Sequence, residues 1–410
     1  MRILLMSANF PPEIGTAAHL FYELAGGLRK RGHEVTAVTG FPSYNVAPEI
    51  AARYRGLHRR ERMDGVSVVR TRVPRFVRAS MIGRGLEHLC MAWPFAAAAL
   101  AAGRHDVTLV YSPPLTLGVA AWLIRWLRRT PFVFNVQDLF PKEAVDIGVL
   151  RSRPIIRALE LLETFIYRRA RFVTAHSAGN REHVIGRGCP AERAAVVPNW
   201  VDTDRVKPMP RDNEFSRRHR LNGRFVVSFA GTMGLLQDME TIVGCASLLK
   251  DHDGIQFLLV GDGVEKPKAE QQIAARGLRN VIMLPMQPRD VYPQILAASD
   301  ASLVTLKTAL ATPAVPSKIL SIMAAQRPVI SSIRDESDAT KLVKGANCGI
   351  CARPEDPGSM AAAVLRLHED RELQRRLGQN GRQYAEAHLS LRAALDRYEA
   401  LFRRAADSTA

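Results

Sequence analysis

The sequence predicts an α/β protein built from two doubly wound, parallel sheets. Its 410 residues are enough for two or three domains. A composition of 47% hydrophobic residues, with only 7% aromatic residues, is typical of soluble α/β proteins. Short apolar runs alternate with amphipathic helical windows, which predicts parallel strands covered by helices. The alternation occurs in two successive series, so we expect two sheets.

The first series predicts an N-terminal domain over residues 1–205. After a first strand, an amphipathic helix is expected to run to about Arg31. Strands are expected at 2–8, 35–39, 66–70, 107–111, 132–136 and 172–175, and further helices near 81–103, 114–129, 153–169 and 178–187.

The second series predicts a domain over residues 206–385, after a charged, proline-bearing stretch at 202–213. Its strands are expected at 225–231, 256–263, 281–284, 301–306 and 328–332. Cys348 and Cys351 form a CxxC sequence without a partner pair or nearby histidines, which favours a short packed strand over a metal site. Residues 386–410 are expected to form a terminal helix that can reach back to the first domain.

The charge of the chain points to a polyanionic partner. The formal net charge is +17, and the first 205 residues hold 29 Lys and Arg against 17 Asp and Glu. Nucleic acid, an anionic bilayer and phosphorylated substrates are the compatible classes. No nucleic-acid recognition motif accompanies the basic runs, so we expect no nucleic-acid partner. Five cysteines and the lack of a signal-peptide pattern predict a cytoplasmic protein without disulfides.

Two apolar windows, 86–102 and 115–129, are too short or too interrupted to span a bilayer. Arginine clusters lie around them, at 53–62, 70–84 and 125–129. Apolar helical faces flanked by arginine predict a protein that rests on the anionic inner face of the cell membrane. The alternative is a pair of buried, sheet-covering helices with a solvated basic rim.

A candidate anion site lies in residues 305–330. The pattern there predicts a strand end, a loop with Pro313 and Pro316, and a helix that begins with Pro-Ser-Lys. Backbone N–H groups from Ser317 onward and the charge of Lys318 would attract an anion above the sheet. An ordinary strand-loop-helix unit with a surface lysine is the alternative.

Several loop motifs occur in a fixed order along the chain. They are PPEIGTAA (11–18), SPPLTLG (112–118), QDLFPKEAVDIGVL (137–150), VPNWVDTD (197–204), FAGTMG (229–234), LLVGDGVEK (258–266) and PSKILSIMAAQRPVI (316–330). Together they resemble the family 4 retaining glycosyltransferases of the GT-B fold, and most closely the branch that assembles bacterial surface polysaccharides. The resemblance implies two Rossmann-like domains that face a central cleft.

The resemblance also implies an activity. It is the transfer of a hexosyl or N-acetylhexosaminyl group from a nucleotide-diphosphate sugar, with a UDP-sugar favoured, to a polyprenyl-diphosphate-linked saccharide on the first domain. Capsule, O-antigen or exopolysaccharide assembly would use the product. Neither a metal nor another cofactor is implied. The departing phosphate would help to deprotonate the acceptor, so that no dedicated enzymic base is required.

The implied donor-binding positions are Gly15, Thr16, Gly231, Thr232, Gly261, Lys266, Met286, Pro316, Ser317, Lys318 and Ser321. Relatives often carry an Arg and a Lys after the first strand of the second domain, but GTMGLLQD (231–238) has no cation. By elimination Lys318 becomes the candidate for the diphosphate, with Lys266 or Lys307 as second cations. Gly15 and Thr16 are equally compatible with a simple strand-helix turn.

Acceptor-side candidates are His19, Gln137 and Glu143, and Asp138 is the second catalytic candidate after Lys318. Gln137 and Asp138 follow the strand at 132–136, at the edge of the sheet where ligands bind. Each candidate has an ordinary alternative: Asp138 as a turn former before Pro141, Glu143 as a solvated first-turn residue, and His19 as a packing residue.

The chain departs from the family pattern at a pair of glutamates. The expected positions are occupied by Pro313 and Ser321. A carboxylate at 321 would accept hydrogen bonds from the donor ribose more completely than a serine does. The loss suggests a second hypothesis, a nucleotide-sugar-binding paralogue that acts as a scaffold. A sugar-nucleotide epimerase of the same fold would need acid/base carboxylates that the cleft loops do not offer.

Overall fold

The computed structural model describes residues 1–13, 15–43, 46–74, 81–146, 148–309, 313 and 315–407, without the side chains of 81–86, 88 and 89. The chain forms two compact units. Unit 1 comprises Met1–Asn199 and Leu391–Ala410, and unit 2 comprises Trp200–Ser390. The sequence predicted a boundary between the domains at residue 205, whereas the first segment of unit 1 ends at Asn199. Trp200 and Val201 belong to unit 2 because the Val201 N–H donates to the Leu389 carbonyl at 2.9 Å.

Unit 1 contains an eight-stranded sheet with the order β3-β4-β2-β1-β5-β6-β7-β8. Its strands are β1 (Arg2–Met6), β2 (Glu34–Gly40), β3 (His58–Met63), β4 (Val66–Thr71), β5 (Val107–Ser112), β6 (Phe132–Val136), β7 (Phe172–Ala175) and β8 (Ala194–Val196). The strands are apolar and almost fully buried, with the exception of the edge strand β3 and of β8. This burial on both faces is typical of a parallel sheet between helical layers.

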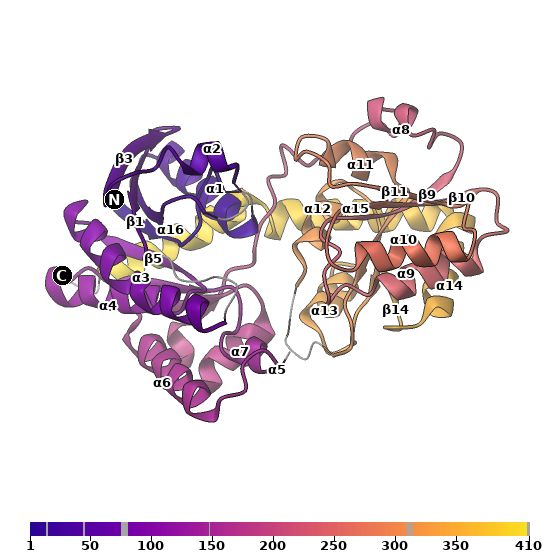
Figure 1. The fold of residues 1–410 in the computed structure, drawn as a ribbon. Coiled ribbons are helices and arrows are strands. Elements are labelled where there is room, and N and C mark those ends of the chain that lie inside the picture. Colours follow the sequence, from indigo (N-terminus) through magenta and orange to yellow (C-terminus); the bar gives the residue numbers. More distant parts are fainter. Residues whose placement is uncertain are drawn as a thin grey trace. The chain divides into compact units, whose positions relative to one another are not determined.

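The helices of unit 1 are α1 (Thr16–Lys30), α2 (Pro48–Ala51), α3 (Met81–Ala101), α4 (Leu117–Arg128), α5 (Lys142–Asp146), α6 (Arg153–Arg169), α7 (Ala178–Gly186) and α16 (Leu391–Asp407). α1 packs on α16, which also contacts β5 and β6, while α3 packs on α4 and α4 on α6. Figure 1 shows the two groups on opposite sides of the sheet. Gly118 permits the close approach of α4 and α6, since a Cβ there would lie 2.6 Å from Ile166.

The first sheet is parallel, as expected, except at one edge, where β3, a strand that the sequence did not predict, runs antiparallel to β4. The sequence of β3, HRRERM, has no apolar alternation, since the strand lies exposed at the edge of the sheet. A buried arginine holds it in place. Arg70 on β4 is 0% exposed, and its Nε donates to the Glu61 carboxylate at 2.5 Å. Its other nitrogens donate to the carbonyls of Gly40 and Pro11.

Unit 2 contains a six-stranded parallel sheet with the order β11-β10-β9-β12-β13-β14. Its strands are β9 (Phe225–Ala230), β10 (Ile255–Val260), β11 (Val281–Leu284), β12 (Ala301–Thr305), β13 (Val329–Ser332) and β14 (Gly349–Ala352). Cys348 and Cys351 lie at β14 as free thiols, and Cys348 is buried in the core. The interpretation of the CxxC sequence as a packed strand is confirmed.

The helices of unit 2 are α8 (Glu214–Arg218), α9 (Met239–Leu248), α10 (Lys266–Ala275), α11 (Tyr292–Ala298), α12 (Ser317–Ala324), α13 (Asp338–Gly345), α14 (Pro357–Glu369) and α15 (Arg371–His388). α9 packs on α10 and α14, and α12 packs on α15. None of the helices in the described ranges is both long enough and apolar enough to cross a membrane.

In both sheets the strand order reverses at one point: the chain first adds strands toward one edge of the sheet and then adds the rest toward the other edge. The reversal lies between β1 and β5 in unit 1 and between β9 and β12 in unit 2. Ligands of doubly wound sheets bind beside the carboxyl ends of the strands at such points. The loops after β9 and β10 in unit 2 and a pocket in unit 1 lie at these points.

Candidate functional site

Two glycine loops interlock above the sheet of unit 2. The first follows β9 at Gly231, and the second follows β10 at Gly261. The Met233 N–H donates to the Asp262 carbonyl at 2.8 Å, and the Glu265 N–H donates to the Met233 carbonyl at 3.0 Å. A Cβ on Gly261 would lie 2.0 Å from the Gly231 carbonyl oxygen. The two loops therefore touch backbone to backbone, a contact that only glycine permits.

Lys318 comes from another element and reaches the same loops. It lies in the first turn of α12, after the N-cap residue Pro316. Its Nζ lies 3.5 Å from the Thr232 carbonyl oxygen and 3.6 Å from the centre of the Phe229 ring. The Cε atom fills the space that a side chain at Gly231 would need, at 2.8 Å from its ideal Cβ position. Helix α12 thus supplies the cation that the loop after β9 lacks.

Lys318 forms no ion pair with a carboxylate in the described part of the chain. Its contacts are an aromatic face and a carbonyl, and burial lowers the pKa of the lysine to about 7. An ammonium in such surroundings lacks the compensation that a bound anion would give. The two alternative cations are neutralised, since Lys307 lies 3.7 Å from Glu265 and Lys266 lies 3.9 Å from Glu270.

The remaining donor-side candidates lie around these loops. Ser317 is exposed beside Lys318, and Met286 is 49% exposed in the loop after β11. Ser321 is half-buried one turn further along α12, where its hydroxyl forms a hydrogen bond with the Tyr292 hydroxyl. Burial raises the pKa of Tyr292 to about 12, against the opposing effect of this hydrogen bond. Ser321 is therefore paired within unit 2.

The candidates at the start of unit 1 lie at the N-terminus of α1. Gly15 is its N-cap residue, with an extended φ of 174° that any residue can adopt. Thr16 is exposed and His19 is half-buried, and the His19 N–H donates to the Gly15 carbonyl at 3.1 Å. The glycine loops of unit 2 and these residues belong to different units.

Gln137 is occupied by a buried amide network at the end of β6. Its amide nitrogen donates to Asn135 at 2.9 Å, and its oxygen accepts from Asn199 at 2.8 Å. Asn135 in turn donates to the hydroxyls of Thr174 and Tyr398, each at 3.0 Å. Gln137 therefore connects the last residue of the first segment of unit 1 to helix α16. Its side chain is buried in this network at the end of β6 and does not point into solvent.

The neighbouring carboxylates differ in their surroundings. Asp138 is exposed next to Gln137. Glu143, in the first turn of α5, accepts a hydrogen bond from the Leu139 N–H at 3.1 Å. Burial and, to a smaller extent, the charge of Asp138 raise the pKa of Glu143. Burial also raises the pKa of the Asp138 carboxyl, although the residue as a whole is exposed. Both carboxyls are therefore harder to ionise than usual, and Glu143 is in addition held by a backbone hydrogen bond.

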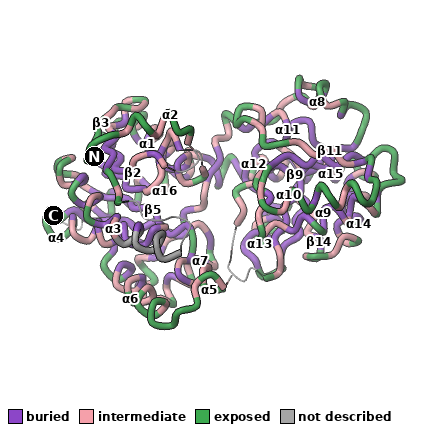
Figure 2. Tube along the Cα trace, in the orientation of Figure 1, coloured by how far each residue is buried: buried purple, intermediate pink, exposed green. Residues whose placement is uncertain are grey.

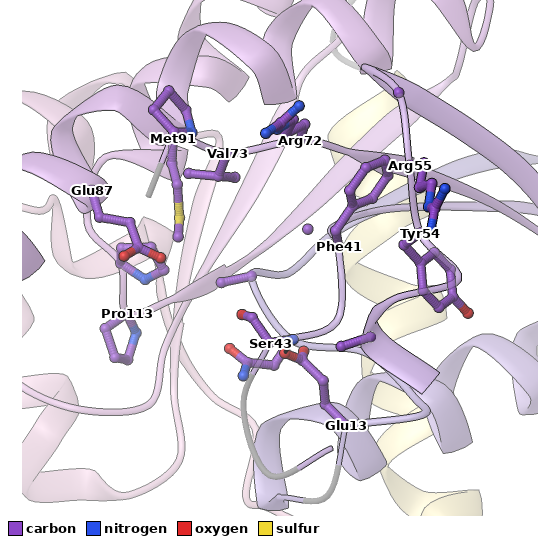
Figure 3. Close-up of a pocket in the computed structure, with 17 residues that line it drawn as sticks. Glu13, Phe41, Ser43, Tyr54, Arg55, Arg72, Val73, Glu87, Met91 and Pro113 are labelled. Atoms are coloured by element: carbon purple, nitrogen blue, oxygen red, sulfur yellow. Dashed lines mark hydrogen bonds between the residues drawn. The ribbon is translucent and has the colours of Figure 1, made fainter. Parts of the chain in front are cut away.

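Unit 1 also contains a pocket of about 820 Å³ at the carboxyl ends of β1, β2, β4 and β5. Figure 3 shows its labelled side chains around one hollow. Glu13 is 2% exposed, and its carboxylate accepts from the N–H groups of Ser43 at 2.8 Å and of Phe10 at 3.4 Å. Arg55 and Arg72 line the pocket as exposed cations. The hollow is large enough for a sugar-sized polar ligand.

Two family models cover most of the chain. Residues 15–200 match the "Glycosyl transferase 4-like domain" and residues 211–384 match "Glycosyl transferases group 1". The probable glycosyltransferase WbjE of Pseudomonas aeruginosa is 30% identical over 72% of this chain and 74% of its own length. The chain belongs to the family 4 glycosyltransferases. The resemblance seen in the loop motifs is confirmed.

Further similarities agree with this family. The putative colanic acid biosynthesis glycosyl transferase WcaI of Escherichia coli is 24% identical over 89% of this chain and 91% of its own length. The crystal structure of Anabaena Alr3699/HepE in complex with UDP superimposes with a TM-score of 0.74 at 19% identity, over 98% of this chain and all of that one. The chain therefore has the GT-B fold.

Sequence reasoning about this glycosyltransferase missed the pocket of unit 1. Its lining comes from short segments near Glu13, Phe41, Tyr54, Arg72 and Glu87, which are far apart in the sequence. Two of the loop motifs could have indicated the pocket, because each contributes to its lining: Glu13 lies in PPEIGTAA, and Pro113 lies in SPPLTLG. Residues 75–80, including part of the basic cluster at 70–84, lie outside the described residues.

Proposed function

We propose that this family 4 glycosyltransferase transfers a sugar from a nucleotide-diphosphate donor, with a UDP-sugar favoured, to a lipid-linked saccharide. The product would enter capsule, O-antigen or exopolysaccharide assembly. The observation that carries the proposal is the position of the Lys318 ammonium against the glycine loop at Gly231. The role of WcaI in colanic acid biosynthesis supports a polysaccharide product, and the UDP bound to Alr3699/HepE supports a nucleotide donor.

Unit 2 would bind the donor diphosphate through backbone and charge. The glycine loops allow phosphate oxygens to approach the main chain, and the first turn of α12 presents N–H groups beside Lys318. As the bond between the anomeric carbon and the diphosphate oxygen breaks, negative charge grows on the departing phosphate. A cation held at that oxygen stabilises the transition state more than the ground state. Lys318 would supply this stabilisation without a metal ion.

The transfer would retain the configuration of the sugar. The acceptor oxygen forms its new bond on the face from which the diphosphate leaves, and the proton of the acceptor hydroxyl passes to the departing phosphate. Asp138 would orient that hydroxyl as an exposed carboxylate at the carboxyl end of β6, while Glu143, with His19, would lie on the acceptor side. The hexosyl or N-acetylhexosaminyl type of the donor is part of the proposal.

The pocket of unit 1 would receive the acceptor. It combines arginines at its surface with the carboxylates of Glu13 and Glu87, which is suited to a ligand that carries both phosphate and sugar hydroxyls. A polyprenyl-diphosphate-linked saccharide has both groups. Pro113 and Phe41 supply apolar contacts of the kind that sugar rings accept.

A second candidate function is that of a scaffold that binds nucleotide sugars without turnover. It is favoured by Ser321, which stands where the family resemblance implies a glutamate and is bonded to Tyr292. Both hypotheses require nucleotide binding at the loops of Gly231 and Gly261. They differ only in whether a sugar leaves the donor.

The deciding experiment measures binding and turnover on the full chain. Thermal shifts with UDP, GDP and their sugars identify the base and report binding by mass action. Radiolabelled donors are then incubated with membrane lipid extract. We expect transfer, and a loss of about 10²–10³-fold in the Lys318→Ala variant. Lys250→Ala, which removes an exposed lysine outside the site, is the control.

The outcomes separate the two hypotheses. Turnover with any donor excludes the scaffold, whereas a thermal shift with no turnover under all conditions supports it. Normal turnover in Lys318→Ala removes this residue from the site, and the absence of any nucleotide shift rejects both functions.

A further inference from the structure

Helices α3, α4 and α6 of unit 1 carry large apolar side chains on their outer surface. Each of the five is between 52% and 72% exposed: Trp93 on α3, Trp126 and Leu127 on α4, and Ile155 and Leu161 on α6. α3 packs against α4, and α4 packs against α6, so these side chains belong to one helical layer. We call this surface the three-helix face. Figure 2 shows exposed stretches along α4 and α6.

The charges on the three-helix face have one sign. Exposed arginines accompany the apolar side chains, at Arg125, Arg128, Arg129, Arg157 and Arg168. α4 contains no acidic residue, and Glu87, the one acidic residue of α3, is buried and lines the pocket. On α6, Glu163 is buried and bonded to His183 and Arg187, and Glu160 pairs with Arg187 at 3.6 Å. Among the residues that the structure describes, none of these five arginines forms an ion pair, so their charge is available to a partner.

Two helices of the three-helix face, α4 and α6, are joined by polar and aromatic contacts, and α3 packs on α4. Arg125 donates to the Arg169 carbonyl at the C-terminus of α6, and the rings of Trp122 and Phe165 meet edge to face at 5.3 Å. The guanidinium carbon of Arg169 lies over the Phe165 ring, 5.5 Å from its centre. The apolar side chains are thus presented by a rigid layer, so that little conformational entropy is lost when a partner covers them.

We propose that the three-helix face docks on an anionic lipid bilayer. Tryptophan at the apolar-polar boundary and arginine beside it are the side chains that the interfacial zone of a bilayer accommodates. The arginines match the negative surface of anionic lipid, and the apolar side chains enter only the headgroup boundary. None of the helices described is able to cross the membrane, which is consistent with a chain that lies on its surface.

The position of α3 gives the docking a consequence for the substrate. Trp93 lies on its exposed side, and Met91 and Glu87 line the pocket of unit 1. A bilayer under the three-helix face would therefore lie close to the pocket, so that a lipid-anchored headgroup could enter it while its chain stays in the membrane. This consequence rests on the proposed acceptor, whereas the docking itself does not.

The docking is tested by sedimentation of the full chain with vesicles of phosphatidylcholine, with and without phosphatidylglycerol. We expect binding to the anionic vesicles that weakens as salt is added. Trp126→Glu and Trp93→Glu should each lower the partition coefficient at least tenfold, and Arg128→Gln and Arg129→Gln by about fivefold each. Leu248→Glu, at an exposed leucine of unit 2, should leave it unchanged.

Tryptophan fluorescence gives a second reading of the same surface. Three of the four tryptophans of the chain, Trp93, Trp122 and Trp126, lie on α3 and α4, and Trp200 is buried in unit 2. Anionic vesicles should shift the emission to shorter wavelength, and lipids brominated near the headgroup should quench it. The shift should be reduced in Trp126→Phe.

Other occupants of the face give different results. A concentration-dependent dimer that Trp126→Glu converts to a monomer, without vesicle binding, would assign the face to a second copy of the chain. Equal binding to neutral and anionic vesicles, or an equal loss in Leu248→Glu, would also overturn the proposal. A failure of sugar transfer with intact vesicle binding rejects the proposed function only.

Discussion

The ammonium of Lys318 lies 3.6 Å from the centre of the Phe229 ring, although the two residues are 89 positions apart. Phe229 is buried in β9, directly before the loop that begins at Gly231. The face of the ring is turned toward the ammonium, and this cation–π contact is favourable but weaker than a contact with an anion. The arrangement holds the cation at the carboxyl end of the strand before any ligand binds.

Nucleotide binding should depend on the protonation of Lys318. Burial lowers its pKa to about 7, so the free protein loses this charge as the pH rises through neutrality. A bound diphosphate restores the preference for the charged form, and binding must then take up a proton above pH 7. We expect the affinity for UDP or GDP, measured by calorimetry, to fall by up to about tenfold per pH unit above 7. A Lys318→Met variant should bind weakly without this dependence.

The same pKa predicts a change of stability with pH. The lysine has an ordinary pKa of 10.5 when unfolded and about 7 when folded, so the unfolded chain binds the proton more tightly. Stability therefore rises as the pH increases from about 7 to about 10.5, and the stabilisation is lost as the pH falls through that range. Lys318→Met should be more stable than the parent chain at pH 6 to 7 in urea unfolding without ligand. A less stable variant would contradict the burial of the charge.

The contact between the glycine loops should not tolerate a methyl group. Gly261→Ala would place a Cβ 2.0 Å from the Gly231 carbonyl, a backbone atom that cannot move alone. We expect a loss of about 1–3 kcal/mol of stability and of the thermal shift caused by nucleotide. Gly345→Ala is the matched control, because nothing lies within 4 Å of its Cβ position. Similar behaviour of the two variants would show that the loops are not tightly packed.

A carboxylate at position 321 should strengthen the donor site. Ser321 now bonds to Tyr292, and a hydroxyl binds ribose less strongly than a carboxylate does. We expect Ser321→Glu to raise nucleotide affinity about tenfold, as a charge-assisted hydrogen bond can do, while Ser321→Ala changes it only slightly. A loss of affinity in Ser321→Glu would mean that the serine is part of a different ribose site, built with Tyr292.

The pocket of unit 1 should affect the acceptor and not the donor. Arg72→Met removes an exposed cation from its lining. In steady-state kinetics with lipid-linked acceptor we expect the acceptor KM to rise about tenfold or more, with the thermal shift by nucleotide unchanged. Arg220→Met, an exposed arginine of unit 2, is the control. A change in nucleotide binding by Arg72→Met would argue against separate sites.

The sequence predicted those elements whose stability is local or fully buried. The apolar runs of β1, β5 and β9 identify parallel strands, since both faces of such strands are covered. Strand β3 was not predicted, because its residues are mostly polar and its position depends on Arg70, a residue of the neighbouring strand. Lys318 was selected by elimination and does reach the Gly231 loop, while its role in donor binding stays a prediction.

The pocket could not be predicted, because no local pattern marks a residue that lines it. Glu13 and Glu87 are 74 positions apart, and the fold alone brings them to one hollow. The acceptor-side role of Gln137 stays a prediction. Its hydrogen bonds to Asn135 and Asn199 could not be predicted, because they depend on packing that periodicity does not encode. The side-chain partners of a polar residue at a strand end are decided by the loops around it.

The link between Asn135 and Tyr398 makes unit 1 discontinuous in sequence. Tyr398 and Phe402 are fully buried against strands made more than 200 residues earlier. On the ribosome, the first sheet emerges long before the helix that covers one side of it, and unit 2 is complete in the meantime. A single cut after Asn199 cannot release a finished unit, and truncation of the last twenty residues should damage the half of the protein that is synthesised first.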